Sequence, residues 1–284
     1  MPHREAAFAR GVLRPRLLRF VDPVGPRRHG GARLDRARAD SIPAPRRRIG
    51  PRSGCGRHDP LGWRSLRARA LGRRCISGGA WLAIAVAIPA LLFLLSTAIV
   101  SVAYGETVDW WSVGRSTELP ELARPLYWLA NVLFYGFDEE VGWRGFALPR
   151  LQARSSALRA SLLLALGWAG WHLPLFVFAD GLSSLGAVGA VGWLVSLALG
   201  SILLTWLFNS SDGSIGAVAL FHAALAIFFT SPVAPGNALP NVMGALLTMG
   251  TLLLIPVFGR TNLSRRSRVV DEHQEARELG ELHR

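Results

Sequence analysis

The sequence predicts an all-α fold, a polytopic membrane helix bundle of about six transmembrane helices. Half of the 284 residues are hydrophobic, and the mean hydropathy is +0.29. After residue 77 the apolar residues form long runs that contain few charges. A helix of about 20 apolar residues crosses the ~30 Å hydrocarbon core of a bilayer. Composition and run length together favour a membrane protein over a soluble domain.

Six apolar stretches account for the predicted helix count. The second is the weakest, because its clean apolar part stops at Phe137, just before three consecutive acids. The expected spans are Ser77–Tyr104, Leu126–Leu148, Ala160–Ala179, Leu185–Phe208, Ser214–Thr230 and Pro240–Phe258.

The charges between the spans predict their orientation. Arginines gather before the first span, after the second and after the sixth, whereas the loop of residues 105–125 is mainly acidic. Cytoplasmic loops carry an excess of basic residues. Six spans with the N- and C-termini in the cytoplasm satisfy this rule at every loop.

The two ends of the chain differ from its apolar middle. Residues 1–74 alternate Arg with Pro, Gly and Ala, and hold 20 of the 32 basic residues. Such a segment buries too little apolar surface to offset the entropy of ordering, so we expect a disordered tail. It could lie on anionic lipid headgroups or precede the true start of translation. Nucleic-acid binding is not expected, because no recognition motif is present. Residues 77–259 are the expected transmembrane domain, and residues 260–284 a polar cytoplasmic tail.

Three consecutive acids, Asp138 to Glu140, lie at the end of the second stretch. A charge inside a membrane segment costs about 3 kcal/mol or more and usually has a functional reason. Glu140 and Arg144 are four residues apart on a helix, so Arg144 can pair with Glu140. Glu139 points about a quarter-turn away and is free for another partner. The alternative is that the acids mark a helix end at the membrane interface, where Arg144 and Arg150 extend to the headgroups.

Two histidines favour the functional interpretation. His172 lies within the third stretch and His222 within the fifth. In the predicted topology both enter from the cytoplasmic side, as Glu139 does, so the three side chains could converge at a similar depth. Together they could orient a water, stabilise an oxyanion or ligate a metal.

These motifs together resemble the CPBP family of intramembrane proteases, which includes the CAAX prenyl endopeptidases and the bacterial Abi-type proteins. The motifs are Glu139-Glu140-x-x-x-Arg144, Trp168-x-x-x-His172 and His222. The residues 139–151 and 171–174 are similar to those of bacterial members. The resemblance covers about Leu126–Phe229.

The resemblance implies an intramembrane endopeptidase of a bacterial plasma membrane, with its active site facing the cytoplasm. Its substrate would be a membrane-associated peptide or protein, hydrolysed by a water that Glu139 activates. His172 and His222 would complete the catalytic set. Glu140, Arg144 and Trp168 would shape the site. Glu139, His172 and His222 could also hold zinc as three ligands with an open position, although their spacing lacks the His-Glu-x-x-His pattern.

Two positions depart from the family pattern. Trp168 stands where the family usually has Phe, and Ala226 stands where it usually has Asn or Asp. An amide there would be a natural oxyanion donor, and the loss of one donor costs roughly 2.7–4 kcal/mol. The chain could therefore be a slow protease, a protease with another donor, or an inactive membrane protein that confers immunity or binds a partner. A proton-coupled transporter is the remaining alternative, since transporters also bury acids and histidines.

Overall fold

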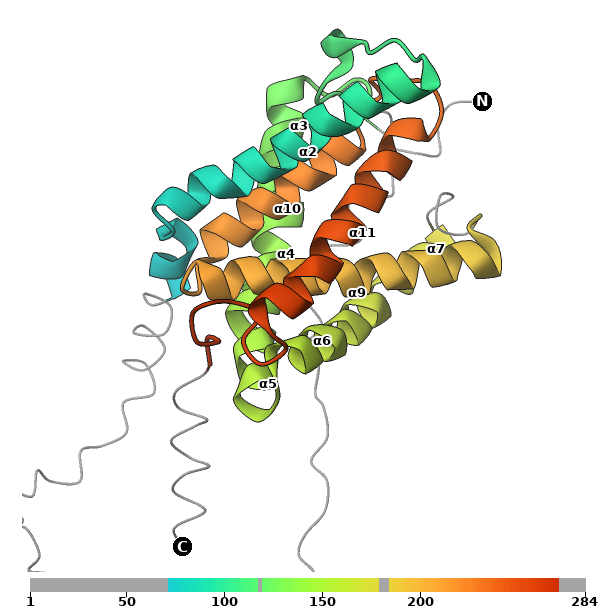
Figure 1. The fold of residues 1–284 in the computed structure, drawn as a ribbon. Helices are drawn as coiled ribbons and strands as arrows, with labels where there is room; N and C mark the ends of the chain where they lie inside the picture. The colour runs from blue at the N-terminus through green and yellow to red at the C-terminus, as the bar shows by residue number, and fades with distance from the viewer. Residues whose placement is uncertain (1–70, 117–118, 179–183, 271–284) are drawn as a thin grey trace, which may run out of the picture. The chain divides into compact units, whose positions relative to one another are not determined.

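The computed structural model describes residues 71–116, 119–178 and 184–270, all within a unit that spans Arg57–Arg284. Every regular element in these ranges is helical (Figure 1). The all-α class is therefore confirmed for the described part of the chain. The count of six spans and the cytoplasmic placement of both termini stay predictions. Most of the predicted tail of residues 1–74, and residues 271–284, lie outside the described residues.

Three helices in the described ranges are long and apolar enough to cross a membrane. They are α2 (Ala80–Tyr104), α9 (Gly186–Ser210) and α11 (Ala238–Phe258). Only 33%, 22% and 11% of their most apolar windows are buried. Long helices that expose so much apolar surface need a lipid environment. The chain is therefore an integral membrane protein.

The second predicted span is one helical path made of several pieces. These are α3 (Arg124–Ala130), the π-helical η3 (Asn131–Asp138), α4 (Glu139–Gly142), the π-helical η4 (Trp143–Ala147) and α5 (Leu148–Arg154). π-helical turns are rare and occur frequently at functional sites. Gly136 in η3 allows a close approach to α10, because a Cβ there would lie 2.8 Å from the Ala219 carbonyl oxygen. The two π-helical segments flank the Glu139–Gly142 turn on both sides.

The third predicted span differs from the expected continuous helix over Ala160–Ala179. The helix α6 (Ala157–His172) ends at His172, and a short helix, α7 (Leu175–Phe178), follows after a turn. Pro174 explains the break, because proline has no N–H to continue the helical hydrogen bonds. The break places His172 in the last turn of α6.

The remaining predicted span is α10 (Ile215–Phe229), a helix of 15 residues. Ser214 caps it by accepting a hydrogen bond from the Ala217 N–H, as is common at helix starts. α10 packs against α2 on one side and η3 on the other, and α6 packs against α9 (Figure 1). A short 3₁₀ turn, η2 (Trp110–Ser112), lies between α2 and α3.

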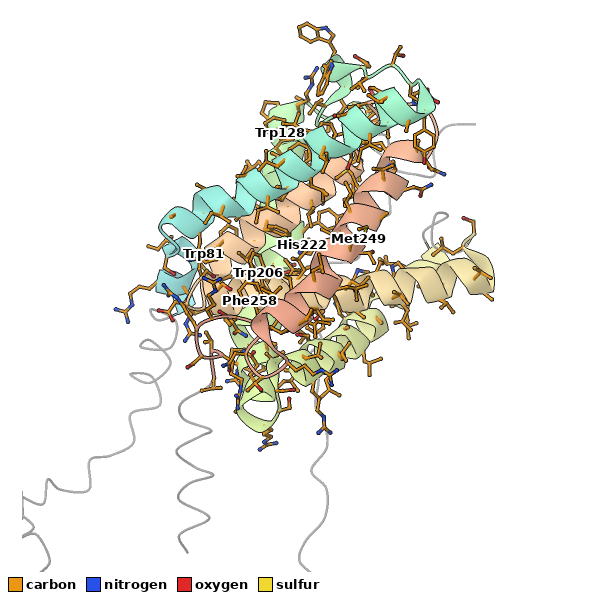
Figure 2. All side chains as sticks on the ribbon, viewed as in Figure 1. Trp81, Trp128, Trp206, His222, Met249 and Phe258 are labelled. Atoms are coloured by element: carbon orange, nitrogen blue, oxygen red, sulfur yellow. The ribbon has the colours of Figure 1, made fainter. Side chains whose placement is uncertain are left out.

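Aromatic side chains join the long helices. Trp206 of α9 lies with its ring centroid 6.0 Å from that of Trp81 in α2 and 6.1 Å from that of Phe258 in α11 (Figure 2). Nearby, Phe208 and Phe221 are fully buried in the main hydrophobic core. This core fixes α9 and α10, and α10 carries His222.

The first residues of the predicted C-terminal tail pack against the helices. Asn209 Nδ2 donates to the Asn262 carbonyl oxygen over 2.8 Å, and Gln152 Nε2 donates to the Val269 carbonyl oxygen over 2.8 Å. Leu263 is fully buried. Residues 260–270 therefore form an ordered cover over the ends of α5 and α9. The domain boundary at residue 259 itself stays a prediction.

Candidate active site

A buried cluster of charged groups surrounds Glu140. Glu140 and Arg144 are both 0% exposed, and Arg144 Nη1 donates to Glu140 Oε1 over 2.9 Å. His222 Nδ1 lies 2.8 Å from the same oxygen. The expected contact between Glu140 and Arg144 is thus present. His222 reaches the pair from α10, which is 82 residues away in sequence from Glu140.

Glu139 has a different partner. It is 8% exposed, and its Oε2 accepts a hydrogen bond of 3.0 Å from the indole Nε1 of Trp168. Because Glu139 and Glu140 are adjacent on α4, their side chains leave the helix in different directions. One carboxylate therefore belongs to a charged cluster, and the other is held by a neutral donor.

Trp168 contacts every other candidate residue except Glu140. The Arg144 guanidinium carbon lies 5.1 Å from the centroid of the Trp168 ring, a cation–π arrangement. The ring centroids of His222 and His172 lie 5.6 and 5.9 Å from the Trp168 ring. The Trp168 side chain therefore lies at the centre of the candidate site.

Hydrogen bonds fix both histidine rings. His172 Nδ1 lies 2.8 Å from the Trp168 carbonyl oxygen, and His222 Nδ1 lies 2.8 Å from Glu140 Oε1. Carbonyl and carboxylate oxygens only accept hydrogen bonds, so Nδ1 carries a proton in both contacts. When each ring is neutral, its Nε2 is then the free acceptor. Both histidines can exchange a proton at Nε2.

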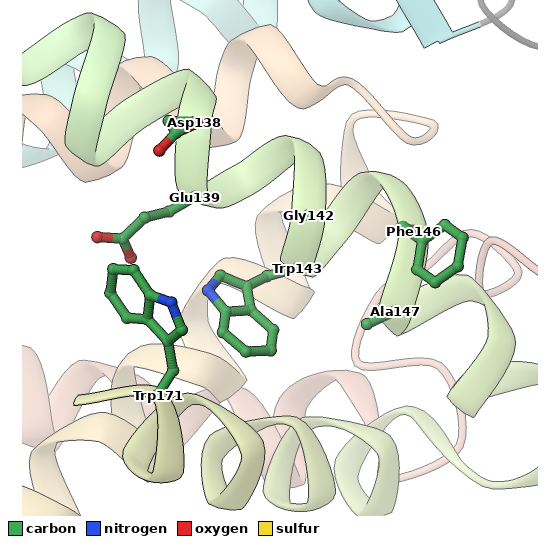
Figure 3. A pocket seen from close by; sticks show the side chains of 7 residues that line it. All are labelled: Asp138, Glu139, Gly142, Trp143, Phe146, Ala147 and Trp171. Atoms are coloured by element: carbon green, nitrogen blue, oxygen red, sulfur yellow. The ribbon is translucent and has the colours of Figure 1, made fainter. Parts of the chain in front are cut away.

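A cavity of about 320 Å³ lies beside Glu139. Figure 3 shows the Glu139 carboxylate above the Trp171 ring, with the Trp143 ring next to it. Gly142 also lines the cavity, and a Cβ added at this position would meet no atom within 4 Å. The cavity gives a substrate room to lie against the carboxylate that Trp168 holds.

Comparison with known proteins connects this geometry to a family. Residues 121–228 match the family described as "Type II CAAX prenyl endopeptidase Rce1-like". This range contains every candidate site residue. Over that segment the chain is similar to the CPBP/CAAX protease family. The family resemblance expected from the sequence is confirmed.

A curated relative supports the same assignment. The chain is 33% identical over 89 residues to a protein named "CAAX prenyl protease 2" from Methanococcus maripaludis. The matched segment covers 30% of the chain and 32% of that relative. The chain thus spans about a third of the length of the CAAX protease that it matches.

The zinc site that the sequence allowed stays a prediction. No group of three His, Cys, Asp or Glu side chains in the described ranges could hold a metal ion. The hydrogen bonds of the candidate residues use Glu139 Oε2 and the Nδ1 atoms of His172 and His222, so they do not by themselves exclude a ligand at the other side-chain atoms. In this arrangement Glu139, His172 and His222 do not offer three converging ligands.

The sequence did not lead us to expect the hydrogen bond between Trp168 and Glu139. It showed only that Trp168 replaces the Phe usual in the family. Trp has an N–H that Phe lacks, and this N–H contacts Glu139. The sequence held a signal for this hydrogen bond. Buried Trp N–H groups usually find a partner, and the Glu139 carboxylate was expected to be free to accept one. The aromatic cavity formed by Trp143 and Trp171 gave no comparable signal.

Proposed function

We propose that the chain is an intramembrane endopeptidase in which Glu139 activates a water for attack on a peptide bond. Similarity to the CAAX protease family and the three long apolar helices support a membrane protease in general. The observation that carries the proposal is the position of Glu139, which is held by Trp168 at the edge of a cavity.

The reaction needs one base at Glu139. The Glu139 carboxylate takes a proton from the water, and the water oxygen bonds to the carbonyl carbon of the substrate. The carbon–nitrogen bond then breaks, and the proton on Glu139 passes to the leaving amine. A positioned base of this kind contributes about 10²–10⁴-fold to a rate.

The histidines supply the charge balance of the site. Glu139 and Glu140 carry two negative charges and Arg144 one positive charge, so the cluster is left with one negative charge. A proton on His222 would balance it, and its Nε2–H could then donate to the developing oxyanion. His172, fixed by the Trp168 carbonyl, is placed as the second proton carrier.

Ala226 limits the proposed activity. It offers no side-chain donor, whereas the resemblance leads to an amide at this position. Arg144 Nε and Nη2 have no protein partner among the described residues. These two groups could donate to a bound water, which could in turn donate to the oxyanion. The His222 and Arg144 donors are the proposed substitutes for the amide. Replacing Ala226 by Asn should raise the rate if these substitutes are poor.

The proposed substrate is a membrane-associated peptide or protein, cut near the cytoplasmic face of a bacterial plasma membrane. The proposal requires no prenyl group on the substrate. Its reacting groups are Glu139 in α4 and His172 at the end of α6. Orientation in the membrane can be tested by labelling single cysteines in loops 105–125 and 155–156 from either side.

The decisive experiment is cleavage of a peptide library by purified protein in detergent. Wild type is compared with Glu139→Ala and His172→Ala, and Glu121→Gln is the control for an exposed acid. Both site variants should lose most of the activity, while the control keeps it. Equal activity of wild type and both site variants would refute the site.

A second candidate function follows from Ala226. Without an oxyanion amide, the chain could bind a partner peptide without cutting it, as an immunity or binding protein does. A folded wild type that binds library peptides but cleaves none, even with Ala226→Asn, would favour this function.

A further inference from the structure

The cavity beside Glu139 has one charged group that the proposed chemistry does not use. Asp138 is the first of the three consecutive acids and also lines the cavity. Glu139 and Glu140 both have side-chain partners. The Asp138 side chain is exposed and, among the described residues, makes no hydrogen bond or ion pair. A carboxylate is therefore available at the edge of the cavity.

The other walls of the cavity are aromatic. Trp143, Phe146 and Trp171 line it, and Figure 3 shows the Glu139 carboxylate next to the two indole rings, with Asp138 farther along the same helix. Trp171 is 56% exposed and Phe146 is 60% exposed, so their faces are accessible. The Arg150 guanidinium already lies 3.7 Å from the Phe146 centroid. The indole rings of Trp143 and Trp171 are therefore the aromatic surfaces that a ligand would contact.

The size of the cavity limits what can enter. Ligand pockets commonly measure about 300–1,000 Å³, and this cavity lies at the lower end with about 320 Å³. It has room for one long side chain. Gly142 keeps this room open, because no atom lies within 4 Å of the position of its missing Cβ.

Aromatic walls with a carboxylate at the edge match a basic side chain. The methylene groups of Lys or Arg pack on apolar surface while the charged end stays at a polar edge. The indole faces attract the cation, and Trp is the best ring for this interaction. An apolar side chain would gain nothing from Asp138, and an acidic one would be repelled by both carboxylates.

We propose that this cavity is a subsite that selects a Lys or Arg next to the scissile bond of the substrate. The inference rests on the proposed function and names its substrate class: the basic cytoplasmic flank of a membrane protein. Membrane proteins carry an excess of Lys and Arg close to the cytoplasmic ends of their spans. Asp138, Trp143 and Trp171 are then specificity-determining residues.

The test is a set of peptides that differ only at one position beside the cleavage site, which holds Lys, Leu, Ala or Glu. Wild type should cleave the Lys peptide with a kcat/KM roughly 5- to 30-fold above that for Leu, the range expected of a cation–π contact. Asp138→Asn should reduce this ratio. Asp138→Lys should reverse the order of Lys and Glu, a result that misfolding cannot imitate.

Three further variants separate charge from space. Glu121→Gln removes an exposed acid elsewhere and should keep the wild-type ratio. Gly142→Leu fills the cavity and should lower cleavage of the Lys peptide more than that of the Ala peptide. Gly250→Leu is its control, because Gly250 also has open space around it but lies on α11.

Equilibrium binding of the same peptides keeps this inference separate from the proposed function. Cleavage without preference for Lys, or an unchanged preference in Asp138→Lys, would overturn the subsite. Preferential binding of the Lys peptide by a folded chain that cleaves nothing would overturn the protease and support the subsite.

Discussion

Two buried polar clusters in this molecule are built in opposite ways. In the first, Gln152 Nε2 donates to Asn209 Oδ1 over 3.1 Å, and Asn209 Nδ2 donates to Gln152 Oε1 over 2.8 Å. Gln152 also donates to the Val269 carbonyl oxygen, and Asn209 donates to the Asn262 carbonyl oxygen and accepts from the Val269 N–H. In the second, Glu140 Oε2 and two nitrogens of Arg144 have no protein partner among the described residues.

The difference separates a structural cluster from a functional one. A buried polar group without a partner costs about 1–3 kcal/mol, and more when it is charged. The amide cluster avoids this cost because its side-chain amides have hydrogen-bond partners, as expected of a structural cluster. The charged cluster keeps open hydrogen-bonding groups beside Glu139, His172 and His222, where water and substrate are needed. Trp206 Nε1 and Thr251 Oγ1 are also buried without a partner among the described residues, but only the cluster of Glu140 and Arg144 combines open groups with buried charge.

The largest expected effect is the loss of activity in Glu139→Gln. Gln keeps the shape and can still accept the Trp168 hydrogen bond, but its amide is not a base. Cleavage should fall by about 10²–10⁴-fold, while the variant keeps a cooperative thermal unfolding transition in detergent. If the variant unfolds readily, the loss of activity would reflect a structural role of Glu139 and not a catalytic one.

Next in size is the destabilisation by Arg144→Met. Removing one partner of a buried ion pair leaves the other charge uncompensated, which costs about 3–5 kcal/mol. The unfolding midpoint in detergent should fall clearly. The double variant Glu140→Gln with Arg144→Met should recover part of this loss, since the uncompensated carboxylate is gone. No recovery would mean that the pair acts through packing alone.

Trp168→Phe should have an intermediate effect on chemistry. Phe keeps an aromatic ring for Arg144 but removes the N–H that holds Glu139, and a hydrogen bond to a charged group contributes about 1.5–3 kcal/mol. We expect kcat to fall by roughly 10- to 100-fold while KM stays nearly constant. Benzothienylalanine at position 168, which replaces the N–H by sulfur, should reproduce this loss. Full activity of either variant would show that the hydrogen bond is dispensable.

Asn209→Ala tests the amide cluster. The variant leaves the Gln152 amide partly unsatisfied, so stability should fall by about 1–3 kcal/mol. The folded fraction should cleave at the wild-type rate, because the cluster lies apart from Glu139. A selective loss of kcat without a loss of stability would contradict the structural role.

The smallest expected effect is that of metal removal. Because the candidate residues do not offer three converging ligands, chelation should leave cleavage and unfolding unchanged. Loss of activity on chelation, restored by added zinc and not by magnesium, would show that the side chains rearrange around a metal.

The sequence by itself determined the helical membrane class and the local pairing of Glu140 with Arg144. Both depend on run length or on residues within one helical turn, which fixed helical geometry decides. The family resemblance came from motifs spread between Glu139 and His222. The sequence also indicated the acids and histidines of the candidate site, which the fold brings close to Trp168. It did not indicate the break of α6 at His172 or the ordered packing of residues 260–270.

Only the tertiary structure decided how the site residues are connected. Trp168 donates to Glu139 across 29 residues, and His222 pairs with Glu140 across 82. These contacts depend on which faces of α4, α6 and α10 meet, and helix packing, which no local pattern encodes, sets those faces. The same packing leaves Asp138 beside two indoles and an open space at Gly142. The sequence thus identified the acids, and the fold assigned each of them a different partner.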